Sequence, residues 1–246
     1  GLMLAASVWA NPEVGRYIHT FNSTSVGREK SAAFVNSLPL ILDELQIIKD
    51  KKDFDQSIYM LSEGAGRTRG NKSGGVDKTP TWSNCIITSG EMPITNASSG
   101  GGAVNRILEV ECTERLFDDP RHVANILKSN YGFAGKAFVE LLQVPEMIEA
   151  AQIIYEQIYA QTKTEDTMEK QAGAAALVLT ADKLVTDWIF KDEKALTVKE
   201  ISEFLKSKEA VSVNQRAYEY ICEYVVQNKN KFCGSSEITE VLGRLE

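Results

Sequence analysis

The chain has 246 residues, of which 43% are hydrophobic and 25% charged, and its formal net charge at pH 7 is −7. This composition is ordinary for a globular protein, and the length suffices for one main domain and a smaller second one. The negative charge argues against general adhesion to nucleic acid or anionic membranes, so any such contact requires a local basic patch. No apolar run reaches the length of a membrane span, which predicts a soluble, cytoplasmic protein without membrane contact.

The cysteines and histidines are few, and their spacing does not favour a metal site. The four cysteines show no CxxC spacing, and the only histidines are His19 and His122. A structural zinc site is therefore not expected. We expect buried, reduced thiols, as in a cytoplasmic protein.

The first elements of the chain alternate between helices and strands. Residues 2–9 form an apolar helical run, which predicts a buried helix. Residues 16–21 contain β-forming side chains and predict a short strand. Thr24 or Ser25 can cap a helix that runs to about residue 36. Alternation of this kind is typical of a parallel sheet with right-handed crossovers.

The most informative stretch is Leu38 to Glu44, with the sequence Leu-Pro-Leu-Ile-Leu-Asp-Glu. Its apolar run is too short for a helix and predicts a strand that is buried on both faces. Ligands of open parallel sheets bind at the carboxyl ends of the strands, where Asp43 and Glu44 stand. In this Walker B pattern, Asp43 is predicted to hold Mg²⁺ and Glu44 to polarise the water that attacks the γ-phosphate of ATP. The alternative is that both acids only lead into the next helix, whose dipole favours them.

A helix is expected over residues 53–63, and a glycine-rich basic loop follows it. Arg67 and Arg69 of this loop have three interpretations. They could be arginine fingers that act on ATP bound to a neighbouring subunit. They could instead hold DNA phosphates, with Lys72 and Lys78 beside them, or belong to a solvated loop.

Two further strands are expected after this loop. Residues 82–88 predict a strand, and Thr88 and Ser89 at its tip are candidates for sensor residues between the acids and the γ-phosphate. A plain strand-end turn is the alternative, because Ser-Gly is common in turns. Residues 106–110 alternate like a strand, and Arg106 at its start is a weaker finger candidate. A solvent-facing arginine at a strand edge is the alternative there.

Only helices are expected beyond about residue 115. They are predicted from Pro120 to Ser129 with Asp119 as the cap, Lys136 to Gln143, Pro145 to Ala160, Met168 to Phe190, Thr197 onward with a capping box, and Val213 to Asn230. The three tyrosines of the last helix are expected in a core and at its rim, and the alternative is a platform for base stacking: Tyr218, Tyr220 and Tyr224.

Lys136 is expected at the N-terminus of its helix. A cation at that position opposes the helix dipole, which a bound anion would explain. The alternative is an ordinary surface lysine with its stem on an apolar surface.

Six blocks of the chain, in this order, resemble the family known as domain of unknown function 927. They are residues 4–12, 38–44, 59–67 and 89–91, the strand start at Arg106, and residues 131–138 (Tyr-Gly-Phe-Ala-Gly-Lys-Ala-Phe). Members of this family are helicase-like P-loop ATPases of phages and mobile elements, often linked to primase modules. The resemblance therefore implies a function on DNA that uses ATP and Mg²⁺, with a homo-oligomeric ring and a primase module among the expected partners.

The resemblance also implies an architecture. Residues 1–115 are expected to form an α/β core of the P-loop type (ASCE or RecA-like), and residues 116–246 an all-helical C-terminal region. The family places its Gly-Lys-Thr phosphate loop immediately before the stretch that opens this chain, so we expect a core that lacks its first strand and that loop. Residues 242–246 are similar to the start of a family strand. The rival expectation is a non-catalytic nucleic-acid-binding or assembly module with a lost or removed ATPase site.

The isolated chain is expected not to hydrolyse ATP. The backbone amides and the lysine of a phosphate loop hold the phosphates, and that loop is expected upstream of Gly1. Phosphate release in the presence of Mg²⁺ measures this directly. Sustained hydrolysis by the purified chain would contradict the expectation.

Overall fold

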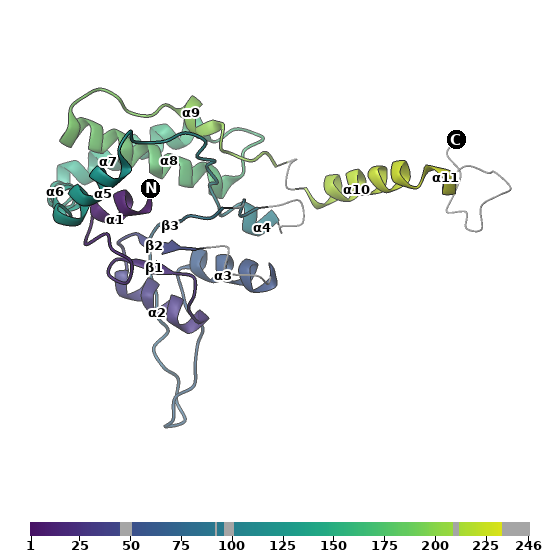
Figure 1. The fold of residues 1–246 in the computed structure, drawn as a ribbon, viewed down its shortest axis with the longest axis horizontal. Coiled ribbons are helices and arrows are strands. Elements are labelled where there is room, and N and C mark those ends of the chain that lie inside the picture. Colours follow the sequence, from purple (N-terminus) through teal and green to yellow (C-terminus); the bar gives the residue numbers. More distant parts are fainter. Residues whose placement is uncertain (45–50, 92, 96–100, 209–211, 233–246) are drawn as a thin grey trace.

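The computed structural model describes residues 1–44, 51–91, 93–95, 101–208 and 212–232. It places a small parallel sheet between layers of helices (Figure 1). The sheet has the order β1-β2-β3, with strands β1 (Ile18–Thr20), β2 (Leu40–Asp43) and β3 (Ile86–Thr88). Both pairings are parallel, so the α/β class and the parallel sheet are confirmed.

Strand β2 is buried on both faces, as its apolar run predicts. Leu40, Ile41 and Leu42 expose 0%, 0% and 1% of their surface. Since side chains alternate along a strand, Leu40 and Leu42 face one side of the sheet and Ile41 faces the other. Ile41 packs with Ile18 of β1 and Ala6 of helix α1 (Leu2–Ser7). Helix α1 is only partly buried, because Leu4 is 41% exposed.

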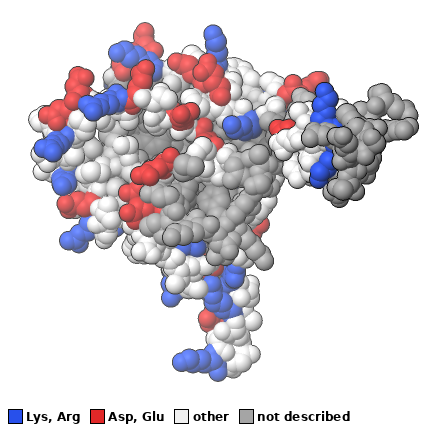
Figure 2. All heavy atoms as spheres, turned by 45° about the vertical axis from the view of Figure 1, so that its right-hand side comes forward, with Lys and Arg blue, Asp and Glu red and all other residues white. Residues whose placement is uncertain are grey.

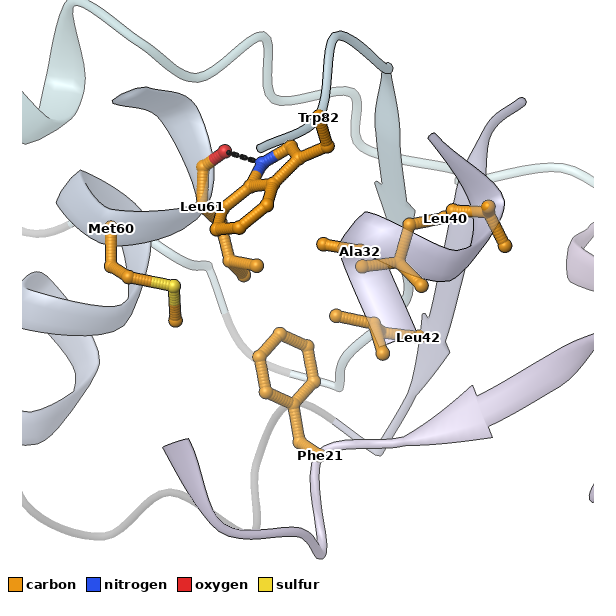
Figure 3. Packing of buried hydrophobic residues seen from close by; sticks show 8 residues of the cluster. Phe21, Ala32, Leu40, Leu42, Met60, Leu61 and Trp82 are labelled. Carbon is orange, nitrogen blue, oxygen red and sulfur yellow. Dashed lines mark hydrogen bonds between the residues drawn. The ribbon is translucent and has the colours of Figure 1, made fainter. Parts of the chain in front are cut away.

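The opposite face of β2 packs against helices α2 (Ser25–Val35) and α3 (Lys51–Glu63). Helix α2 begins as predicted, because Thr24 Oγ1 accepts a hydrogen bond from the Gly27 amide at 3.1 Å. Figure 3 shows the core on this side, with Phe21, Met60 and Trp82 packed around the β2 leucines. The Trp82 indole Nε1–H donates to the Leu61 carbonyl at 2.8 Å, so the one polar atom of this ring is satisfied.

The chain between α3 and β3 forms an antiparallel hairpin, which we call the arm (residues 64–82). Its two sides pair through bridges between Ala65 and Thr81 and between Gly70 and Val76. At the tip, Asn71 Oδ1 accepts hydrogen bonds from the amides of Ser73 and Gly75. The arm projects from the body of the molecule (Figure 1). The predicted glycine-rich loop is thus an ordered hairpin.

Every described element after β3 is a helix. They are α4 (Gly101–Val104), α5 (Pro120–Ser129), α6 (Phe133–Leu142), α7 (Pro145–Thr162), α8 (Glu169–Val185) with its π-helical continuation η2 (Thr186–Phe190), α9 (Val198–Ser202), α10 (Val213–Gln227) and α11 (Lys229–Phe232). Two predicted caps are confirmed. Asp119 accepts from the first amides of α5, and Thr197 and Glu200 form a capping box at α9.

The strand predicted for residues 106–110 is wrong. Arg106 follows α4 in a turn, and residues 107–110 have no strand partner within the described part of the chain. The buried side chain of Gln171 replaces such a partner, because its amide donates to the carbonyls of Val104 and Ile107 at 2.9 and 2.8 Å. A side chain 64 residues away in the sequence thus satisfies this backbone.

The predicted start of α6 at Lys136 is also wrong, since the helix begins at Phe133. The amides of Gly132 and Gly135 donate to the carbonyls of Ser7 and Val8 at the end of α1, at 2.8 and 3.0 Å. A helix leaves the amides at its start and the carbonyls at its end without partners. Here the first amides of α6 bind the last carbonyls of α1, so both sets are satisfied. This contact requires glycine, because a Cβ on Gly135 would lie 2.5 Å from the Val8 carbonyl oxygen.

Helix α10 extends away from the rest of the molecule (Figure 1). Its tyrosines are not in a core as predicted, because Tyr218, Tyr220 and Tyr224 are 65%, 69% and 40% exposed. The three described cysteines are free, as expected, but they are exposed rather than buried. Cys233 and residues 242–246 lie outside the described residues.

None of the described helices combines the length and the apolar character that crossing a membrane requires.

Replacing Gly135 by alanine should destabilise the protein by about 1–3 kcal/mol, because the new methyl group overpacks the junction of α1 and α6. Gly173 in α8 is the matched control, since a Cβ there meets nothing nearer than 3.7 Å. Its replacement by alanine should be neutral or stabilise by up to about 1 kcal/mol, because glycine weakens helix interiors. Urea unfolding of both variants measures the difference, and equal stabilities would contradict the close contact.

Candidate functional site

The carboxyl ends of the three parallel strands meet at one edge of the sheet. The register places Thr20 of β1 opposite Asp43 of β2, and Leu42 of β2 opposite Thr88 of β3. Asp43 is therefore at the centre of this edge, with Thr88 and then Ser89 on the neighbouring strand. Ligands of open parallel sheets bind at such an edge.

The structure brings Asp43, Glu44 and Ser89 together. The Ser89 hydroxyl donates to Asp43 Oδ1 at 2.7 Å, and the same oxygen accepts the Glu44 amide at 2.9 Å. Glu44 has a φ of 61°, which is uncommon for a residue with a side chain and marks a sharp turn of the backbone. Its side chain is exposed, and Asp43 is half-buried. The edge thus carries the Asp43 carboxylate, which hydrogen bonds orient, and the Glu44 carboxylate, which is exposed.

This group of side chains fits Mg²⁺ better than it fits a metal that the protein encloses. Within the described ranges, no group of three or more His, Cys, Asp and Glu residues could hold a metal ion. Mg²⁺ keeps several waters and is commonly bound through one or two carboxylates together with substrate phosphates. The second oxygen of Asp43 has no hydrogen bond within the described part of the chain, so it can serve as such a ligand.

The arm carries the two predicted arginines, and they differ in their surroundings. Arg69 Nη1 lies 2.7 Å from Oε2 of Glu29, a fully buried carboxylate of α2, whereas Arg67 is exposed. Bonding and attraction by Arg69 hold the pKa of Glu29 below its usual range, although burial acts in the opposite direction. Arg69 is therefore engaged within its own chain. We call this ion pair the clasp, because it joins the arm to α2.

A recess of about 300 Å³ lies between α2 and the base of the arm. It is lined by Val26, Glu29, Lys30, Arg67, Arg69, Asp77, Lys78 and Pro80. Figure 2 shows basic side chains gathered along the arm, at the bottom of the view. This is the local basic patch that an acidic chain needs for contact with a polyanion.

Arg106 and Lys136 are not part of the sheet edge described above. Arg106 donates to the Gly102 carbonyl at 2.7 Å, and its guanidinium lies 4.9 Å from the centre of the Tyr59 ring. Lys136 is a surface residue of α6, and its Nζ lies 3.8 Å from Oε1 of Glu140. Helix α6 packs against α7 and η2. No contact with the residues of the sheet edge, within the described part of the chain, supports their predicted binding of nucleotide or anion.

Sequence analysis missed Glu29 and Lys30. Two successive charged residues in a helix are usually solvated, and Glu29 is instead buried beside Arg69. The partner is 40 residues away in the chain, so no local pattern identifies the pair. The one available signal was a basic loop in an acidic protein, which requires compensating acids nearby.

Comparisons with known proteins agree with the resemblance found in the sequence. Residues 1–82 match the model of the family described as "Domain of unknown function (DUF927)". This part of the chain is therefore similar to the DUF927 family, over about a third of the sequence. The match includes Asp43, Glu44, Arg67 and Arg69, while the blocks at residues 89–91, 106 and 131–138 lie beyond it. No curated protein matches the sequence.

A solved structure described as "SCCmec type IV Cch - active helicase" is similar to this chain. The TM-score is 0.65, the sequence identity is 16%, and the alignment covers 98% of this chain. It covers 46% of the solved chain, so this chain spans less than half of that protein's length. At this identity the likeness shows the fold alone.

The clasp predicts a pH dependence of stability. The lowered pKa of Glu29 means that its ionised form stabilises the fold at neutral pH, and that this contribution is lost as the pH falls below the usual range of a glutamate and through the lower folded-state pKa. Changing Glu29 to Gln should therefore cost about 1–3 kcal/mol at pH 7 and much less at pH 3. Changing the exposed Glu149 of α7 to Gln is the control and should matter at neither pH. Urea titrations at both pH values test this, and a constant cost of Glu29→Gln would show that charge is not involved.

Proposed function

We propose that this chain is part of a helicase-like ATPase that couples ATP hydrolysis to the remodelling of DNA during replication or transfer of a phage or mobile element. The observation that carries the proposal is the group of Asp43, Glu44 and Ser89 at the carboxyl edge of a parallel sheet. The DUF927 match and the likeness to a protein described as an active helicase support it. The P-loop type of the core belongs to the same proposal.

The residues at the edge divide the chemistry between them. When ATP and Mg²⁺ are bound, the metal would neutralise charge that develops on the phosphates. Asp43 would hold Mg²⁺ together with waters, and the Ser89 hydroxyl fixes the orientation of the Asp43 carboxylate. Glu44 is close enough in the chain to share the site, and its open carboxylate can take the proton of an attacking water. Thr88 lies beside Leu42 in the register, in the position proposed for a sensor.

The phosphates themselves need a binding loop, for which the proposal relies on the segment expected upstream. The described sheet has two edge strands, β1 and β3, so it can accept a further parallel strand that leads into such a loop. Domain limits at residues 1–115 and 116–246, cytoplasmic localisation, a ring-shaped homo-oligomer and a primase module remain parts of the proposal.

The finger role of the arginines is a separate part of the proposal. A finger must reach the phosphates of a neighbouring subunit with an unengaged guanidinium. Arg69 is paired with Glu29 in its own chain, so Arg67 is the better candidate of the two, and a finger role there is the alternative to contact with a nucleic-acid strand. Arg106 and Lys136, with the in-chain contacts described above, are weaker candidates for nucleotide binding.

The rival function is a non-catalytic nucleic-acid-binding module. The basic arm favours it, because an arm of this kind can bind a polyanion without any hydrolysis. The two functions are distinguished by Glu44, which only the ATPase requires.

The test uses a longer protein, in which the proposed strand and phosphate loop are added upstream of this chain. Glu44→Gln should leave ATP binding intact and lower kcat by about 10²-fold or more, because an amide cannot accept the proton. Glu149→Gln, on the exposed surface of α7, is the matched control and should hydrolyse ATP at the wild-type rate. An unchanged rate in the Glu44 variant would remove this residue from the mechanism, whereas no hydrolysis by the wild-type longer protein would favour the rival.

A further inference from the structure

The recess at the base of the arm combines cations from two separate elements. Lys30 comes from α2, while Arg67 and Lys78 come from the two sides of the arm. Glu29, Arg69 and Asp77 also line it, so four cationic and two acidic side chains share about 300 Å³. In a chain with a net charge of −7, such a concentration of positive charge is a local exception.

The charges of the recess are not equally available to a ligand. Arg69 is ion-paired with Glu29 at 2.7 Å, and Asp77 also attracts it. Lys30, Arg67 and Lys78 have no ion pair with any residue that the structure describes. Three cations around a concave surface can therefore bind an anion without first breaking a contact.

The clasp fixes the position of these cations relative to each other. A Cβ on Gly66 would lie 2.8 Å from Glu29 Oε2 and 2.7 Å from Pro80 Cγ, so the arm backbone packs directly on the buried carboxylate. The Gly66 amide also donates to the Pro80 carbonyl at 2.8 Å, which joins the two sides of the arm at this level. Glu29 and Arg69 thus hold Arg67 and Lys78 next to Lys30.

We propose that this recess binds backbone phosphates of a nucleic-acid strand, with Lys30, Arg67 and Lys78 as contact residues and Glu29 and Arg69 as positioning residues. The inference rests on the proposed function and deepens it, because it names where the strand is held. The recess has no aromatic side chain among its lining residues, so it offers no platform for base stacking. Binding is therefore through phosphates and independent of sequence.

The same phosphate chemistry could come from a nucleotide, but the shape of the arm favours a strand. Cations occur at its base, in Lys78, beside its base, in Lys30 of α2, and at its tip, in Lys72, which is exposed. A linear polyanion can contact both places, whereas a single triphosphate can fill only one. Asp43 and Ser89 of the sheet edge are not among the residues that line the recess.

The test measures binding of labelled single-stranded and duplex oligonucleotides of unrelated sequence to the full chain, without nucleotide, between about 50 and 200 mM salt. Lys30→Ala, Arg67→Ala and Lys78→Ala should each weaken binding several-fold at the low-salt end. Each should also reduce the slope of log K against log salt by about 0.7–0.9, which is the loss of one phosphate contact. Lys199→Ala, on the exposed side of α9, is the control and should change neither quantity.

The clasp is tested by rescue. Arg69→Ala should weaken binding, and Arg69→Lys should recover most of it, because lysine can still pair with Glu29. Glu29→Gln should weaken binding without lowering the salt slope, since it removes no phosphate contact. Circular dichroism confirms that each variant is folded. A slope that falls by about 0.7–0.9 in Arg69→Ala and recovers in Arg69→Lys, while Glu29→Gln binds as tightly as the wild type, would make Arg69 a contact residue and overturn its positioning role.

Two results would overturn the recess as a strand-binding site. One is an unchanged affinity in all three contact variants. The other is efficient competition by Mg²⁺–ATP or tripolyphosphate at equal phosphate concentration, which would assign the recess to a nucleotide. The assay involves neither hydrolysis nor Glu44, so its failure leaves the proposed ATPase untouched. Loss of the ATPase proposal would likewise leave oligonucleotide binding measurable.

Discussion

Complete burial of three successive residues, Leu40, Ile41 and Leu42, is the constraint on which the rest of the structure depends. A strand whose side chains alternate between faces can be buried in this way only if helices cover both faces. Helix α1 supplies one cover, and α2 and α3 supply the other. The same burial sends the chain out of the sheet at Asp43, so the first polar side chain after the core lies at the carboxyl edge. Packing of the core thereby determines where the candidate site residue Asp43 lies.

Helix α2 satisfies this constraint in an unusual way, because it turns charges inward. Arg28 and Glu29 are 8% and 0% exposed, whereas Phe34 is 87% exposed. Burying charge is costly unless each charge finds a partner, and both do. Arg28 donates to the carbonyls of Phe21 and Ser23 and to Ser57 of α3. Glu29 pairs with Arg69 of the arm. The inner face of α2 therefore contributes hydrogen bonds and an ion pair as well as hydrophobic packing.

Sequence signals predicted the structure where the forces are local. The apolar run of β2, the Thr24 and Asp119 caps and the Thr197 capping box act within a few residues, and all four are confirmed. The failures are long-range. Gln171 binds the Ile107 carbonyl, which a strand partner of residues 106–110 could have used, and Ser7 and Val8 set the start of α6. Of the predicted site, the structure joins Asp43, Glu44 and Ser89, and it pairs Arg69 with a residue that no pattern indicated.

The two successive charges of α2 connect parts of the molecule that the sequence separates. Arg28 holds the Phe21 carbonyl, directly after β1, and the Phe21 amide in turn donates to the Asp43 carbonyl at 3.0 Å. Glu29, the next residue, holds the base of the arm. A rigid helix cannot move one of these attachments without the other, because both start from neighbouring positions on its first turns. The backbone at the candidate site and the basic arm are thus attached to one element, which is the arrangement that the proposed coupling of hydrolysis to a bound strand would need.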